Sequence, residues 1–200
     1  MTKPPINSYN YTPIYQDLNI NLKKLYCAMA YFSADTEIYK RVFKQDDLYY
    51  SENFPWVKGL VLNKNPHITL LYGLLESVKL EHVETVLKGW NPPKFEIDYY
   101  DYFESPNDEE YYCIIGKIKL TPEILEAHQR LSLLPHINTF FEYKPHLTIA
   151  YIKKDKLNLG RYLDLLTINP FERKLGICNP HLEYQNCTYD NNTNPQTIKL

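Results

Sequence analysis

The chain contains nearly the same nonapeptide twice, as NPHITLLYG at residues 65–73 and as KPHLTIAYI at residues 144–152. In each copy a histidine follows a proline, a threonine stands two positions after the histidine, and a tyrosine stands three positions after the threonine. With these residue frequencies, Pro-His-x-Thr is expected by chance only about 0.02–0.03 times in the chain. The repetition therefore indicates a structural or chemical requirement rather than composition.

Two other Pro-His pairs, at residues 135–136 and 180–181, serve as internal controls because neither is followed by a threonine at the same spacing or lies in a comparable run. Pro-His alone is thus common here, and the threonine and strand context distinguish the motifs. No histidine of the Pro-His pairs has a second histidine or a carboxylate at ligand spacing, so no metal site is expected. Outside the motifs, the histidines are interpreted as structural: His82, His128, His136 and His181.

Both motifs are predicted to be β-strands, in which residues i and i+2 point to the same face. His67 and Thr69 therefore project together from the first strand, and His146 and Thr148 project together from the second. The residues between them face the core. The tyrosines that end the motifs fall on the opposite parity and are expected to be core or strand-end residues: Tyr72 and Tyr151.

Two histidine/threonine pairs that face one another suit phosphodiester chemistry near neutral pH. An imidazole has an unperturbed pKa of about 6.5, so one ring can be neutral while the other is protonated. The neutral ring removes a proton from the attacking oxygen, and the protonated ring donates one to the leaving oxygen. Threonine hydroxyls can hold the non-bridging oxygens as charge builds, and no metal or other cofactor is required.

The segments around the motifs predict the order strand, helix, motif strand, helix, hairpin, helix, motif strand, which is an α+β arrangement. Strands are expected at 25–32, 94–103 and 110–120, and helices at 35–44, 77–90 and 123–134. Ser77 is predicted to cap the second helix, and Thr121-Pro122 to open the third. We divide the chain into an N-terminal arm, a core and a polar C-terminal appendage or lid with a helical piece near 155–166; the three parts are 1–22, 23–152 and 153–200.

At His67-Ile68-Thr69 and His146-Leu147-Thr148 the sequence resembles the 2H phosphoesterase superfamily, over roughly residues 23–152. The resemblance implies a bilobal α+β fold, with two antiparallel-sheet lobes related by pseudo-twofold symmetry around a concave cleft and helices outside. It also implies that the two histidines act as acid and base and that the two threonines bind phosphate. Which histidine is the base stays open.

Within that superfamily, PHITLLYGL and PHLTIAY look most like the phage anti-CBASS phosphodiesterases, which degrade the cyclic di- and trinucleotide signals of bacterial antiphage immunity, such as cGAMP. This resemblance implies a cyclic oligonucleotide substrate and action in the cytoplasm of a bacterial host. Ribose 2′-OH attack on a 3′–5′ linkage would open the ring to a 2′,3′-cyclic phosphate. Nucleobases stack on aromatic side chains, and the candidates are Tyr31, Phe32 and Phe171.

The formal net charge of −2 and the pI near 6.3 argue against a protein that grips long nucleic acid. No run approaches the length of a membrane span, the thiols are expected to be reduced, and a monomer is expected.

One alternative function is cleavage of 2′,3′-cyclic phosphates at RNA ends or of 2′–5′ oligonucleotides, which would favour a basic groove. The positive residues near the second motif are Lys144 and the Lys153-Lys154 pair. A protein that sequesters a nucleotide without cleaving it is the lower alternative, because it would not need two intact pairs.

Overall fold

The computed structural model describes most of the chain between residue 25 and residue 200. The described residues are 25–32, 36–52, 57–61, 66–105, 110–137, 142–168, 174–175, 177–186 and 195–200. The predicted N-terminal arm and the candidate Phe171 lie outside them. The strands are β1 (Leu25–Phe32), β2 (His67–Leu75), β3 (Phe95–Glu104), β4 (Tyr111–Ile118), β5 (His146–Lys153), β6 (Lys174–Leu175), β7 (Ile177–Asn186) and β8 (Gln196–Thr197), and the helices are α1 (Thr36–Val42), α2 (Leu80–Leu87), α3 (Pro122–Leu131) and α4 (Lys156–Ile168).

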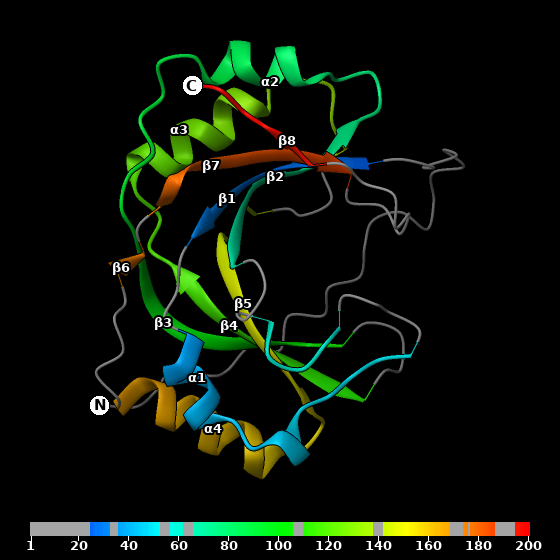
Figure 1. The fold of residues 1–200 in the computed structure, drawn as a ribbon, viewed down its shortest axis with the longest axis vertical. Helices are drawn as coiled ribbons and strands as arrows, with labels where there is room; N and C mark the ends of the chain where they lie inside the picture. Colours follow the sequence, from blue (N-terminus) through cyan, green and yellow to red (C-terminus); the bar gives the residue numbers. More distant parts are fainter. Residues whose placement is uncertain are drawn as a thin grey trace.

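Within the described residues, the strands follow one another in the order β6-β3-β4-β5-β2-β1-β7-β8, and every pairing is antiparallel. The two motif strands, β2 and β5, are neighbours in the middle of this order (Figure 1). They share a single pairing position, Ile68 with Leu147, and so join two half-sheets. The predicted α+β class with antiparallel sheets is confirmed.

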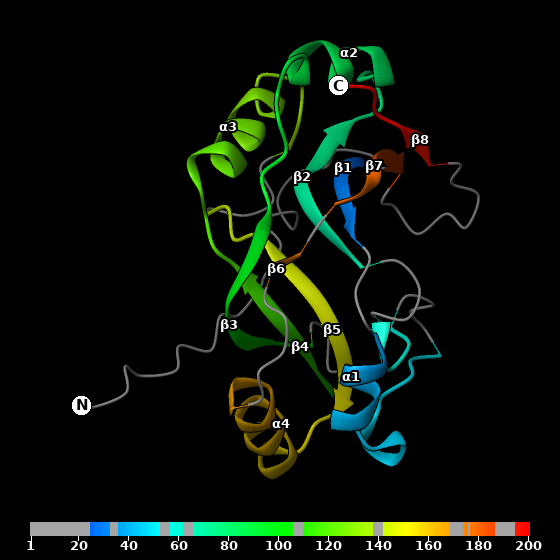
Figure 2. The same ribbon diagram turned by 60° about the vertical axis from the view of Figure 1, so that its left-hand side comes forward.

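Each half-sheet has its own pair of helices. Helices α2 and α3 pack on each other and α3 packs on β2, whereas α4 packs on β3 and α1 on α4. Figure 2 shows the two helix pairs at opposite ends of the molecule. One continuous apolar core lies between the strands and the helices of both halves; it includes Ile68, Leu70, Ile124, Leu147 and Tyr162. The other face of the strands is therefore left for the motif side chains.

Helix α3 begins as the sequence predicts. Thr121 is extended, its side chain accepts a hydrogen bond from the Ile124 N–H at 3.4 Å, and Pro122 occupies the first turn, where a missing N–H costs nothing. Helix α2 begins later than predicted, and Ser77 is not its cap. Val78 is buried in the core, and the N-cap is Lys79, whose N–H donates to Nδ1 of His82 at 3.0 Å.

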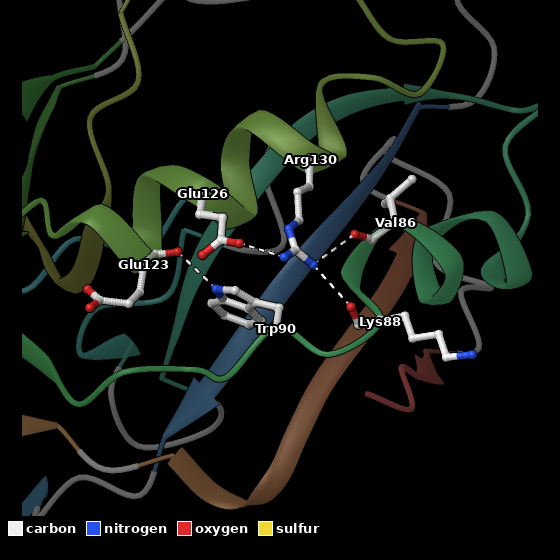
Figure 3. A network of polar contacts seen from close by, with 6 residues as sticks. All are labelled: Val86, Lys88, Trp90, Glu123, Glu126 and Arg130. Atoms are coloured by element: carbon white, nitrogen blue, oxygen red, sulfur yellow. Dashed lines mark hydrogen bonds and ion pairs between the residues drawn. The ribbon is translucent and has the colours of Figure 1, made fainter.

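A polar network fixes the end of α2 against α3 (Figure 3). The Arg130 guanidinium donates to the carbonyls of Val86 and Lys88 at 3.4 and 3.1 Å, which are carbonyls that a helix end leaves without intrahelical partners. The Trp90 indole N–H donates to the Glu123 carbonyl at 2.9 Å, and Trp90 itself is buried. These contacts hold α3 in place behind β2.

The prediction of a C-terminal appendage after residue 152 is wrong. Strand β7 pairs along β1, from Tyr26 with Asn186 to Ala30 with Leu182, and β8 pairs with β7. Leu182 belongs to the main core, together with Tyr184 and Ile198. Polar residues alternate with these buried ones along the segment. Its sequence is therefore largely polar, although the segment completes the first half-sheet.

Cys27 is disulfide-bonded, which departs from the expectation of reduced thiols throughout, whereas Cys113 is a free, buried thiol. In the described part of the chain, no helix combines the length and the apolar character needed to cross a bilayer.

Candidate active site

The four motif side chains meet where the half-sheets join. Because Ile68 pairs with Leu147 in an antiparallel register, His67 lies opposite Thr148 and Thr69 lies opposite His146. The two paired residues are buried in the core, and the four motif side chains are half-buried on the other face. The histidines are diagonal neighbours, which in such a pair lie roughly 7–8 Å apart. Both imidazoles therefore project from the same face of neighbouring strands, an arrangement that suits an acid and a base acting on one phosphodiester.

The half-repeat extends beyond the motifs to the strands beside them. Strand β1 pairs with β2 as β4 pairs with β5, so each motif residue has an equivalent neighbour in the other half. The equivalent pairs are Tyr31↔His67 and Lys117↔His146, Met29↔Thr69 and Ile115↔Thr148, and Cys27↔Tyr72 and Cys113↔Tyr151. The residue at the end of the neighbouring strand also donates its N–H to the carbonyl of the motif proline, Phe32 to Pro66 at 2.9 Å and Ile118 to Pro145 at 3.0 Å.

Both motif strands contain a bulge directly after the threonine. Ala28 pairs with Leu71 and Met29 with Thr69, so Leu70 has no partner in β1, and Ile149 is skipped in the same way opposite β4. An extra residue in one strand reverses the parity of the side chains beyond it. Tyr72 and Tyr151 therefore lie on the histidine face and pack in the small clusters there, rather than in the main core. The prediction that they lie on the face opposite to the histidines is therefore wrong.

Two side chains contact backbone carbonyls of β2 at its first bulge, those of Thr69 and Leu70. The Tyr143 hydroxyl donates to the Thr69 carbonyl at 3.2 Å, and Nδ1 of His128 lies 2.9 Å from the Leu70 carbonyl. The two rings are stacked, with centroids 3.8 Å apart and an interplanar angle of 7°. Burial lowers the pKa of His128, so the neutral ring donates through Nδ1–H. The predicted structural role of His128 is confirmed, and its contact helps to position the first motif.

We expect Tyr143→Phe to lower the free energy of unfolding by about 1 kcal/mol, because the Thr69 carbonyl loses its hydrogen bond in a half-buried place. Urea unfolding monitored by circular dichroism measures this change. Tyr50→Phe is the matched control, since its hydroxyl makes an exposed hydrogen bond with Gln45 and its loss should change the free energy by less than about 0.5 kcal/mol. Equal stability of the Tyr143 variant and the unmutated protein would contradict the supporting role.

The two histidines have different surroundings. Nδ1 of His146 lies 2.9 Å from the Lys144 carbonyl, and the His146 ring meets the Phe103 ring edge-on with centroids 4.9 Å apart. Burial lowers the pKa of His146 to about 4; the Lys144 carbonyl opposes this shift, and the charges of Lys117 and His67 add to it. His146 is therefore neutral at pH 7, donates through Nδ1 and leaves Nε2 as a proton acceptor.

His67 lies instead against an aromatic ring and a polar cluster. The Tyr31 ring centroid is 5.3 Å from that of His67 and 5.6 Å from that of His181. Gln185 donates to the Tyr31 hydroxyl at 3.1 Å, and burial together with the Glu183 carboxylate raises the pKa of Tyr31. The structure thus places Tyr31 beside His67, but Tyr31 is only 9% exposed.

Phe32 is not brought there. It points to the other face of β1, is only 5% exposed and packs edge-on against Phe95 in the main core. A platform for a nucleobase has to present a free ring face, which this burial excludes.

Sequence reasoning missed the side chains that β7 contributes. His181, Glu183 and Gln185 share the face of Tyr31, and Nε2 of His181 lies 2.5 Å from a Glu183 carboxylate oxygen. His181 was expected to be structural, but it is exposed on this face. The alternation of these residues with Leu182 and Tyr184 is a strand signal that could have identified them.

Two antiparallel half-sheets that bring two His-x-Thr pairs to one face define the two-histidine class of phosphoesterases. Residues 56–166 match the family model of the 2′-5′ RNA ligase superfamily. The matched segment covers more than half of the chain. The chain belongs to this superfamily, and its activity is of the phosphodiesterase type. A search of curated proteins finds no match.

Proposed function

We propose that the protein is a metal-independent phosphodiesterase that opens 3′–5′ linkages in cyclic di- or trinucleotides, and that its substrates are signals of bacterial antiphage immunity. The observation that carries the proposal is the pairing of Ile68 with Leu147, which puts both His/Thr pairs on one face. The net charge of −2 supports a compact ligand over a long RNA strand. Resemblance of the motif sequences supports the cyclic substrate.

In the proposed reaction His146 is the base, because its ring is neutral and its Nε2 is free to accept a proton. It takes the proton of the ribose 2′-OH as the oxygen attacks phosphorus. His67, in its protonated form, gives a proton to the departing 5′-oxygen as the P–O5′ bond breaks. The product is a linear nucleotide with a 2′,3′-cyclic phosphate and a free 5′-OH.

The threonines stabilise the negative charge of the phosphate oxygens and take no part in proton transfer. Each threonine lies across from the histidine of the other strand, so Thr69 lies beside His146 and Thr148 beside His67. Their hydroxyls donate to the non-bridging oxygens, whose negative charge grows as the fifth bond to phosphorus forms. Because one hydroxyl comes from each motif strand, the two hydroxyls hold the phosphate group between the two histidine rings.

The low pKa of His146 has a measurable consequence for the pH profile. We expect kcat/KM to stay high as the pH falls from about 7 to about 5, and to decline as His146 is protonated near its pKa of about 4. Protonation removes the lone pair that the base needs, so activity is lost on the acid side. A profile of kcat/KM against pH, with circular dichroism at each pH, measures this; an acid limb centred at about 6.5 would contradict the assignment of His146 as base.

Substrate class is tested with a panel offered in excess EDTA: cyclic di- and trinucleotides, an RNA ending in a 2′,3′-cyclic phosphate, and 2′–5′ oligoadenylate, with products identified by mass. We expect the cyclic nucleotides to be cut most efficiently. The family match favours the second candidate function, cleavage of RNA ends or 2′–5′ linkages. If only those substrates are cut, the second candidate replaces the first; if none is cut and one binds, the protein is a sequestering one.

A further inference from the structure

A lysine lies beside the second catalytic histidine. Lys117 is on β4 directly opposite His146 in the strand register, so both side chains are on the same face. Lys117 is only 7% exposed, and within the described part of the chain its ammonium is buried and has no hydrogen-bond partner. A buried charge without a partner costs free energy, so its presence requires a reason.

The surroundings of Lys117 do not supply that reason. Its Nζ lies 5.1 Å from the centroid of the Phe103 ring, a weak contact for a charge that has lost its water. Burial lowers the pKa of Lys117; Asp101 and Glu142 oppose the shift, and Lys144 adds to it. Glu142, however, is already paired with Lys144, at 3.0 Å. Within the described residues, neither carboxylate forms a hydrogen bond with the buried ammonium, so its charge has no direct partner there.

The half-repeat makes the position more specific. Lys117 stands opposite His146 as Tyr31 stands opposite His67. In the first half this position is an aromatic ring whose hydroxyl is hydrogen-bonded by Gln185, and in the second half it is a cation. The two halves thus differ in charge at the place that faces each histidine.

We propose that Lys117 binds a non-bridging oxygen of the substrate phosphate beside His146. This inference rests on the proposed function, because it assumes that a phosphodiester occupies the face between the histidines. The ammonium donates a charge-assisted hydrogen bond to an oxygen that becomes more negative in the transition state. Its charge also disfavours protonation of His146, which keeps the base neutral.

Lys117→Met tests the proposal, with inorganic phosphate as the probe and calorimetry as the measurement. We expect phosphate to bind at least tenfold more weakly, because the variant keeps the length of the side chain and loses the charge. Its melting temperature should equal or exceed that of the unmutated protein, since an unpaired buried charge has been removed. The matched control is Lys119→Met, which removes an exposed positive charge just beyond the end of the same strand and should leave phosphate binding unchanged. Unchanged phosphate binding in Lys117→Met would overturn the proposal.

A second measurement needs no variant. In the unmutated protein with isotope-labelled lysine side chains, NMR follows the titration of Lys117 with and without saturating phosphate. If phosphate binds the charged form tenfold more tightly than the neutral form, the pKa of Lys117 rises by about one unit. A pKa that does not move with phosphate would overturn the proposal. Both measurements are independent of turnover, so they can succeed where the substrate panel finds no cleavage.

Discussion

His67→Ala and His146→Ala should each lower the rate of phosphodiester cleavage by about 10²–10⁴-fold, which is the usual contribution of a positioned acid or base. Loss of His146 leaves the 2′-OH without an acceptor for its proton, and loss of His67 leaves the 5′-oxygen to depart as an alkoxide. Single-turnover rates with a cyclic dinucleotide measure both effects. Both side chains are half-buried and lie outside the main core, so we expect the variants to keep the fold.

His136→Ala is the matched control for the two histidine variants. His136 also follows a proline, but its Nδ1 lies 2.8 Å from the Leu134 carbonyl and its backbone bridges to Leu74. Its substitution should leave the cleavage rate within about threefold of normal, a difference of less than 1 kcal/mol in activation free energy. A near-normal rate in either His67→Ala or His146→Ala would contradict a two-histidine mechanism.

Thr69→Val and Thr148→Val should each lower kcat by about 10²–10³-fold, as loss of one donor to a developing oxyanion does. Valine keeps the β-branched shape that suits a strand and removes the hydroxyl. If the hydroxyls act on charge that grows in the transition state, kcat falls and KM changes little. Steady-state kinetics of the two variants measure kcat and KM separately and so show which of them changes.

Thr197→Val is the control for the threonine variants, because Thr197 is an exposed residue of β8 paired with Glu183 and is not in either motif. We expect normal kinetics from it. If the motif variants raised KM and left kcat unchanged, the hydroxyls would bind the ground state only, and the proposed role in catalysis would have to be abandoned.

The features that were predicted correctly from the sequence depend on local signals. Strand β1 was predicted as 25–32 from its apolar run, and α3 was placed from its threonine cap and the proline that follows. The motif strands were recognised from a repeat within the chain itself. In each case the signal lies inside the segment that it predicts.

The features that were missed depend on pairing between distant strands. The bulges at Leu70 and Ile149 move Tyr72 and Tyr151 to the other face, and a strict alternation rule cannot anticipate them. Their trace in the sequence is an apolar doublet after each threonine, because the bulged residue and the next one both face the core. Lys117 left no such trace, because a lysine in a strand is usually exposed. Only the register with β5 places it beside His146.

In the proposed mechanism two histidines open a phosphodiester through attack of the neighbouring 2′-OH, without a metal. The most direct test is a single turnover of a cyclic dinucleotide in excess EDTA and in heavy-oxygen water, with the first product analysed by mass. We expect a linear product with a 2′,3′-cyclic phosphate that contains no heavy oxygen. A first product that carries heavy oxygen on a phosphate monoester would show attack by water, and that result would contradict attack by the 2′-OH.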